Sequence, residues 1–187
     1  MTIERDSFDT ILTGNTIQNN AEDGIQLTDE VVRTYIVANA ITNNAQEGIY
    51  FSDKAQTSTV AYNTISGGLY GIRGTSEIRL NIWTRNSITG VISAPIQLAS
   101  NANRNMLPPY DLSVSGVTLR GKARANATIE VYSDDVGQAA FFEGKTVADA
   151  SGNWVFNAAG PWRGAQITAL AIASDRGASE LAVPIPR

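Results

Sequence analysis

Four polar side chains take equivalent places in the first hundred residues and are the residues of this chain best suited to binding chemistry. Gln26, Tyr50, Arg73 and Gln97 each follow directly on an isoleucine in a short alternating segment. Neighbouring residues of a strand point to opposite faces, so the four are expected to form one outward row. Sugars stack on aromatic rings and bond to planar polar groups. The row therefore predicts a strip for carbohydrate contact, and the alternative is an ordinary solvent-facing sheet.

Pairs of acidic residues one repeat apart are a second group of candidates. Asp29 and Asp53 are separated by 24 residues, as are Asp23 and Glu47, so each pair is expected on adjacent coils. Stacked carboxylates can mark a calcium site, because calcium takes oxygen ligands. The alternative is a solvated loop face, since neither pair has the D-x-D-x-D spacing of a dedicated calcium loop. We take Asp29 and Asp53 as the calcium candidates and expect no other cofactor.

Composition excludes much common enzymology. The chain has 187 residues, a net charge of −4, and no Cys or His. It therefore has no Ser-His-Asp triad, no imidazole base and no thiolate, and we assign no catalytic residue. Net acidity argues against a nucleic-acid partner, which needs a basic face. No run approaches the ~20 apolar residues that span a bilayer.

The acidity is uneven along the chain. Residues 1–100 carry six basic and ten acidic side chains, whereas residues 101–187 carry eight of each. A polyanionic substrate would be repelled by the first part unless calcium bridged the charges. This balance counts against a uronate-binding groove in residues 1–100.

A repeat of about 24 residues must position the candidates. N-x-I triplets begin at Asn15, Asn39, Asn63 and Asn86, in steps of 24, 24 and 23 residues. Apolar residues stand three places before each Asn, and Gly-Ile pairs recur with Gly24, Gly48 and Gly71. Short strands with turn residues at this period predict a parallel β-solenoid of about four coils over residues 1–100. We expect an isoleucine core, an Asn ladder bonded between coils, and turn positions for the three glycines.

The sequence pattern changes after residue 100, where the 24-residue repeat ends. Residues 101–109 are polar and end in Pro108-Pro109, which predicts an extended linker. Residues 110–187 hold short strands separated by turn signals, among them Thr128 to Tyr132 and the segment after Asp149 to Asn153. This spacing suggests a β-sandwich, with Trp154 and Trp162 packed inside it.

Both parts resemble known families. The N-x-I and G-I-x-L pattern is similar to the right-handed parallel β-helix repeats of polysaccharide lyases, mannuronan epimerases, periplasmic NosD-like proteins and many bacterial surface proteins. Residues 110–187 resemble bacterial Ig-like modules, without the Cys pair of antibody-type domains. The implied fold is all-β: a right-handed parallel β-helix of about four coils followed by a C-terminal Ig-like β-sandwich.

We do not assign the activities of these families to this chain, because the residues that carry them are missing. Tyr70-Gly71-Ile72 begins like the Tyr-Gly-Phe/Ile-Asp-Pro-His motif of the epimerases but lacks its Asp, Pro and His, so we interpret it as a turn and a core isoleucine. A copper role of the NosD type is disfavoured, because the chain has no His, no Cys and only two Met.

We therefore predict a non-catalytic extracellular or cell-surface module, part of a longer secreted chain, that presents a face to a polysaccharide or cell-surface glycan. One alternative is the C-terminal portion of a β-helix polysaccharide lyase, epimerase or hydrolase whose catalytic coils lie upstream. A further alternative is a structural rod that self-associates end to end through its first coil. Thr2 to Phe8 are one candidate for a makeshift cap of that coil, and the alternatives are further coils before Met1 or two copies stacked end to end.

Overall fold

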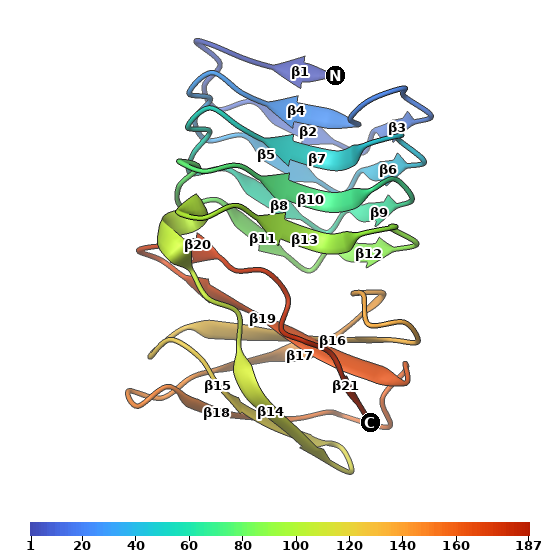
Figure 1. Cartoon of the computed structure of the whole chain (residues 1–187), viewed down its shortest axis with the longest axis vertical. Coiled ribbons are helices and arrows are strands. Elements are labelled where there is room, and N and C mark those ends of the chain that lie inside the picture. The colour runs from blue at the N-terminus through green and yellow to red at the C-terminus, as the bar shows by residue number, and fades with distance from the viewer.

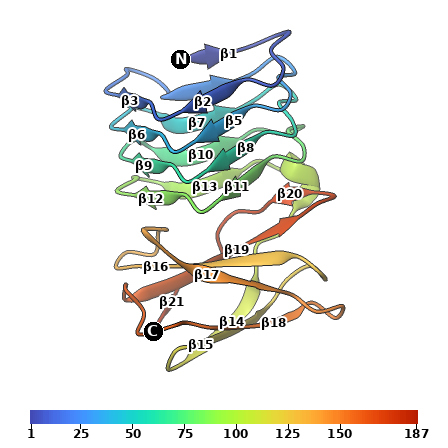
Figure 2. The same cartoon turned by 180° about the vertical axis from the view of Figure 1, so that it is seen from behind.

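The computed structural model describes residues 1–187 and contains two stacked parts (Figures 1 and 2). Residues at the N-terminal side form a parallel β-solenoid, and the antiparallel sheets of the C-terminal side lie below its last coil. Apart from one short 3₁₀ turn, η1 (Ala102–Asn105), all regular structure is β. No helix is long and apolar enough to cross a membrane.

The solenoid has three parallel sheets. The front sheet joins β1 (Thr2–Ile3), β4 (Ile25–Leu27), β7 (Glu47–Phe51), β10 (Tyr70–Gly74) and β13 (Ala94–Leu98). The second sheet joins β2 (Ile11–Thr13), β5 (Tyr35–Val37), β8 (Thr59–Ala61) and β11 (Ile82–Thr84). The third joins β3 (Thr16–Gln18), β6 (Ala40–Thr42), β9 (Thr64–Ser66) and β12 (Ser87–Thr89). Each repeat thus contributes one strand to each sheet, and the predicted solenoid of about four coils is confirmed.

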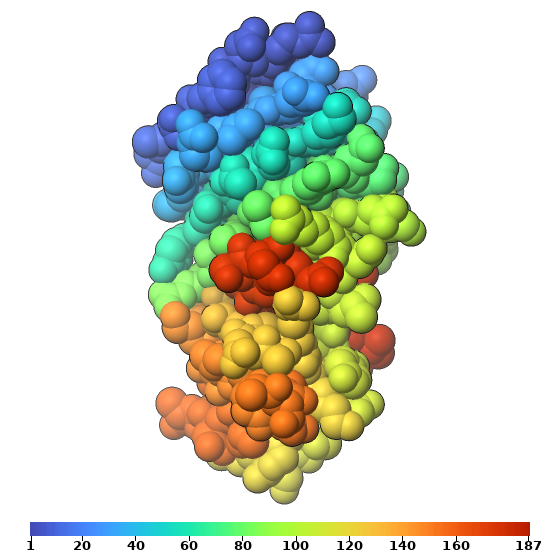
Figure 3. All heavy atoms as spheres, turned by 90° about the vertical axis from the view of Figure 1, so that its left-hand side faces the viewer, coloured from blue at the N-terminus to red at the C-terminus, as the bar shows by residue number.

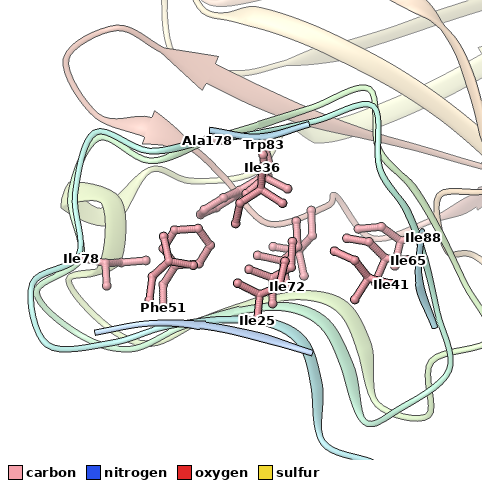
Figure 4. Close-up of a cluster of buried hydrophobic side chains, with 14 of the residues drawn as sticks. Ile25, Ile36, Ile41, Phe51, Ile65, Ile72, Ile78, Trp83, Ile88 and Ala178 are labelled. Carbon is pink, nitrogen blue, oxygen red and sulfur yellow. The ribbon is translucent and has the colours of Figure 1, made fainter. Parts of the chain in front are cut away.

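Rows of identical side chains fill the solenoid. Ile41, Ile65 and Ile88 stack in one row from the third sheet, and Ile25 and Ile72 belong to a row from the front sheet (Figure 4). Trp83 closes the row of the second sheet and its ring lies 6.1 Å from that of Phe51. Burying one such aliphatic side chain contributes about 1.5–3 kcal/mol, so the rows are the main stabilisation of the coils.

The Asn ladder forms as expected. In each step, the Oδ1 atom of one Asn accepts the backbone N–H and the Nδ2 group of the Asn in the coil before it. For Asn63 the two accepted bonds come from Asn39 and measure 2.9 and 3.0 Å. The same arrangement links Asn15 to Asn39 and Asn63 to Asn86. A buried corner of the backbone is thereby satisfied without water.

Gly48 and Gly71 do not lie in turns, contrary to the expectation from sequence. They lie inside β7 and β10. A Cβ at Gly48 would stand 2.5 Å from Cγ2 of Ile65 and 2.7 Å from the carbonyl oxygen of Gly71. These positions need glycine because the front sheet closely approaches the isoleucine row, not because the backbone turns.

The C-terminal part contains two antiparallel sheets. The outer sheet joins β14 (Tyr110–Ser115), β15 (Thr118–Lys122) and β18 (Asn153–Asn157). The inner sheet joins β17 (Phe141–Val147), β16 (Thr128–Asp134), β19 (Gln166–Ala173) and β20 (Gly177–Ala178), with β21 (Ile185–Pro186) also on β19. Trp154 and Trp162 are buried in the core that the two sheets share, as expected.

The inner sheet also closes the bottom of the solenoid. Tyr132, Leu170 and Ala178 belong to the solenoid's own hydrophobic core. The indole N–H of Trp83 donates to the carbonyl of Ser179 at 2.7 Å. The central strands β16 and β19 are therefore buried on both faces, one against the outer sheet and one against the last coil.

A buried carboxylate secures this junction. Glu130 is 2% exposed and accepts hydrogen bonds from the backbone N–H of Arg85 at 3.0 Å and the hydroxyl of Tyr132 at 2.6 Å. Its other oxygen accepts from the hydroxyl of Thr84. Burial raises the pKa of Tyr132 well above its usual value, and the neighbouring Glu130 charge acts in the same direction. The phenol therefore stays a donor to the carboxylate.

The segment expected to be an extended linker is instead folded against both parts. Residues Ala102 to Asn105 form η1, and Ala102 and Asn103 are buried. The Nδ2 group of Asn103 donates to the carbonyl of Asn81 at 2.9 Å and to that of Ala178 at 2.8 Å. Asn103 therefore bonds across the junction, whereas Asn101, Arg104 and Asn105 are exposed to solvent.

The first coil is open. Thr2–Ile3 pairs with β4 and Phe8 bridges to Val32, so the first eight residues extend the coil and do not cover its end. Leu12 and Ile17 belong to the rows that are buried in later coils, but here they are only partly buried.

Candidate functional site: a polar strip on the front sheet

The four predicted binding residues form one continuous row. Gln26 pairs with Tyr50, Tyr50 with Arg73 and Arg73 with Gln97 in the register of β4, β7, β10 and β13. All four are partly buried, because each side chain lies against those of the neighbouring coils. The 23- to 24-residue spacing placed these residues correctly, since parallel in-register strands stack equivalent positions directly.

A second row lies beside the first and was only partly found from sequence. It contains Asp23, Glu47 and Tyr70, with Tyr70 in register with Glu47. The backbone N–H of Glu47 donates to Oδ1 of Asp23 at 3.1 Å. The interpretation of Asp23 and Glu47 as a solvated loop face is wrong for Glu47, which lies in β7 and is 3% exposed. Tyr70 likewise lies in β10 and not in a turn.

Arg73 joins the two rows. Its Nη1 donates to Oε1 of Glu47 at 2.7 Å. The guanidinium carbon lies 5.2 Å from the ring centre of Tyr70 and 5.8 Å from that of Tyr50, within range of cation–π attraction. Sequence reasoning missed this contact because Arg73 reaches diagonally across the strands, whereas the repeat reports only directly stacked positions. The same 23-residue step that aligns Arg73 with Tyr50 would have aligned Tyr70 with Glu47.

The Asp23 carboxyl is partly protonated near neutral pH. Burial raises the pKa of Asp23 to about 7, and a hydrogen bond with the Glu47 side chain raises it further against a smaller opposing effect of the Glu47 backbone N–H. The Glu47 hydrogen bond raises the pKa of Arg73. Burial raises the pKa of Tyr50, so its hydroxyl remains protonated. A carboxyl that is half protonated near pH 7 can donate or accept a hydrogen bond.

The strip therefore offers several kinds of polar contact on one flat surface. Amides lie at both ends in Gln26 and Gln97, and phenol hydroxyls and a fixed guanidinium lie between them. Because Arg73 is held by Glu47 and two rings, little conformational entropy remains to be lost when a ligand accepts its other N–H groups. This set offers amide, phenol, guanidinium and carboxyl groups for hydrogen bonds with a ligand.

The calcium candidates lie at a separate corner. Asp29 and Asp53 occupy equivalent left-handed positions with φ of 55° and 44°. Asp29 faces Arg5 at 3.6 Å, and Asp53 accepts a hydrogen bond from the hydroxyl of Thr28 at 2.8 Å. No group of three or more His, Cys, Asp or Glu residues is placed to hold a metal ion. A calcium role for the pair stays a prediction.

Fold and site together define the class of protein: a parallel β-solenoid with a polar strip across its widest sheet. Residues 2–107 match the family described as periplasmic copper-binding protein (NosD), and the chain belongs to this family. No curated protein is similar enough in sequence to count as a relative.

The side chains of this chain do not fit the copper that the family description names. Copper sites in proteins are built from His, Cys and Met. His and Cys are absent, Met106 is buried in the core of the C-terminal sheets, and Met1 lies at the opposite end of the molecule. We therefore derive no function through copper.

Proposed function

We propose that this chain is a non-catalytic carbohydrate-binding module of the cell envelope or cell exterior, and that the strip of Gln26, Tyr50, Arg73 and Gln97 is its binding face. The observation that carries the proposal is the register of these four residues across adjacent strands. Their exposed groups recur at the strand spacing of about 4.8 Å. A polysaccharide lying across the strands would meet a new polar side chain at each step.

The sugar contact is centred on Tyr50. Its ring is partly exposed and stacks with Arg73 on one side, so the rigid aromatic surface and the fixed donor act together. Stacking and hydrogen bonds of this kind recognise sugars without covalent chemistry. Net acidity of residues 1–100 favours a neutral glycan over a polyanion at this face.

A pull-down on immobilised polysaccharides tests the strip. The panel contains neutral and acidic polymers, with Ca²⁺ or with EDTA, and the supernatant is assayed for released sugar. We expect retention on a neutral polymer and its loss in Tyr50→Ala. Tyr62→Ala is the matched control, because Tyr62 is 55% exposed and stacks with Arg85 at 5.5 Å but lies between β8 and β9.

Unchanged retention of Tyr50→Ala would refute the strip, as would failure of the wild type to bind any polymer. Released sugar would instead favour the alternative in which the chain belongs to a β-helix polysaccharide enzyme. Loss of retention in EDTA would support the calcium role of Asp29 and Asp53.

We further propose that residues 110–187 are an Ig-like sandwich that serves as a spacer, with residues 101–109 as the boundary between the two domains. Two antiparallel sheets around one core support this assignment. The periplasmic description of the family supports a location in the cell envelope or outside the cell. Two reporter fusions of the native gene test the location. One reporter is active only in the periplasm and the other only in the cytoplasm, and we expect activity from the periplasmic reporter.

A second candidate function is end-to-end self-association through the first coil. It is favoured by the exposed Phe8 and Ile11 and by the partly buried Leu12 and Ile17 at the open end. Light scattering should then detect a dimer, and Ile11→Asp should dissociate it. A strictly monomeric wild type at high concentration would refute this candidate.

A further inference from the structure

A pocket of about 350 Å³ lies on the side of the molecule where the solenoid meets the C-terminal sheets. Its walls come from the chain that leaves η1, from the segment after β15 and from the turn between β19 and β20. Figure 3 shows this last turn, in red, between the green coils and the yellow segment of the C-terminal part. The pocket is formed jointly by the junction segment and the C-terminal sheets, and the residues that line it are far apart in the sequence.

The pocket is basic in a protein of net charge −4. Arg124 and Arg176 line it, and the backbone carbonyl of Arg104 accepts a hydrogen bond from Arg176. The one acidic residue of the group, Asp175, is outside the lining and holds Nη2 of Arg124 at 2.7 Å. Its backbone carbonyl accepts from Nη1 of Arg104 at 3.0 Å. Of the two lining guanidinium groups, that of Arg124 is paired with the Asp175 carboxylate and that of Arg176 has no acidic partner, which leaves a local excess of one positive charge.

The guanidinium groups are held in place but are not saturated. Arg176 donates one N–H to the backbone carbonyl of Arg104, while its Nε is buried and has no hydrogen-bond partner. Arg124 uses only Nη2. A guanidinium carries five N–H donors in a planar fork that matches the two oxygens of a carboxylate. An incoming carboxylate would therefore find unused N–H donors on both Arg124 and Arg176.

The remaining wall is apolar and aromatic. Leu107 is 71% exposed and Tyr110 is 53% exposed, and both line the pocket together with Pro108. A small inorganic anion would use only the arginines and would leave this wall and most of the volume without contacts. A ring that carries a carboxylate would use both, because the sugar face can lie on Tyr110 while the carboxylate meets the arginines.

We infer that this junction pocket binds an acidic sugar, with the carboxylate of a uronic acid residue paired to Arg124 and Arg176 and the sugar ring against Tyr110. The site is separate from the front-sheet strip and does not rest on the function proposed for it. The basic junction would attract a polyanion that the acidic coils of residues 1–100 repel.

Titration calorimetry at low salt tests the inference with trigalacturonic acid as the probe. The wild-type chain should bind the acid. The uncharged methyl ester should bind with an affinity at least about tenfold lower, because each charge-assisted hydrogen bond contributes about 1.5–3 kcal/mol. Arg176→Ala and Arg124→Ala should each weaken binding by a similar factor, and Tyr110→Ala should weaken acid and ester alike.

Matched controls separate this pocket from other charges and from the strip. Arg120→Ala removes an equal charge from an exposed position of β15 outside the pocket and should leave affinity within about twofold. Tyr50→Ala should leave it unchanged, so a failed strip and a failed pocket are distinguishable. Thermal unfolding of each variant shows whether it is folded, and the comparison of acid with ester needs no variant.

Several results would overturn the inference. These are no binding of the acid, equal binding of the ester, or an Arg120→Ala variant as weak as Arg176→Ala. Inorganic phosphate or triglutamate binding as tightly as trigalacturonic acid would show a general anion or acidic-peptide site in place of a sugar site.

Discussion

The Asn ladder makes a quantitative prediction, because the same side chain stands in a buried and in an open coil. Asn63 is 1% exposed. Its Oδ1 accepts from the backbone N–H and the Nδ2 of Asn39, and its own Nδ2 donates to the carbonyl of Ile36 at 2.8 Å and to Oδ1 of Asn86 at 2.9 Å. Asn63→Ala removes all four bonds at once.

The cost follows from what is left behind. The backbone N–H of Asn39 loses its acceptor in a place that water does not reach, which costs about 1–3 kcal/mol. The other lost bonds add about 1 kcal/mol net, so we expect Asn63→Ala to lower the free energy of unfolding by about 2–4 kcal/mol. Asn15 is exposed, and no hydrogen bond reaches its Oδ1. Asn15→Ala should cost less than about 1 kcal/mol.

Urea unfolding followed by circular dichroism measures both variants against the wild type. Asn63→Ala should lower the free energy of unfolding more than Asn15→Ala, because residue type and ladder position are matched and only burial and acceptor role differ. Equal destabilisation of the two variants, or a loss below about 1 kcal/mol for Asn63→Ala, would refute the view that the ladder stabilises the coils by satisfying buried backbone.

Three further predictions follow from the coils and the junction. Because the folded pKa of Asp23, about 7, lies above its unfolded value of 3.8, wild-type stability should lose a contribution as pH rises from about 4 to 7. Asp23→Asn should remove that loss, and identical pH profiles of urea midpoints would contradict it. Gly48→Ala should lower stability by about 1–3 kcal/mol through overpacking, whereas Gly160→Ala, with nothing within 4 Å of the added Cβ, should be neutral in the same assay. Trp83→Ala should cost about 3–5 kcal/mol and expose the solenoid core to a hydrophobic dye, and a variant as stable as wild type would contradict the assignment of Trp83 to the junction.

The stacking of equivalent side chains on successive coils was predictable, because it depends only on the repeat length of 23 to 24 residues. The outward row from Gln26 to Gln97 and the ladder from Asn15 to Asn86 both follow from equal spacing in parallel strands. The diagonal contact of Arg73 with Glu47 did not follow, because the repeat says nothing about how far a long side chain reaches along the sheet. The binding strip was therefore predicted as a row of residues, while its electrostatics were not.

The packing of the solenoid against the C-terminal sheets could not be predicted from the sequence pattern either. In β16 the sequence alternates as a strand with one buried face, yet Glu130 and Tyr132 are buried on the other face against the last coil. Alternation reports which residues share a face, but not what covers that face. For the same reason, the sequence predicted Asn103 of η1 to lie in an exposed linker, whereas the structure buries it at the junction.

The sequence by itself determined the solenoid, its coil number, its isoleucine and asparagine rows and the register of the strip, since each of these repeats locally and needs only neighbouring coils. Only the tertiary structure decided that the C-terminal sheets close the last coil, that burial raises the pKa of Asp23 to about 7, and that Arg124 and Arg176 line one pocket. These features join residues with no common period, so their positions depend on long-range packing.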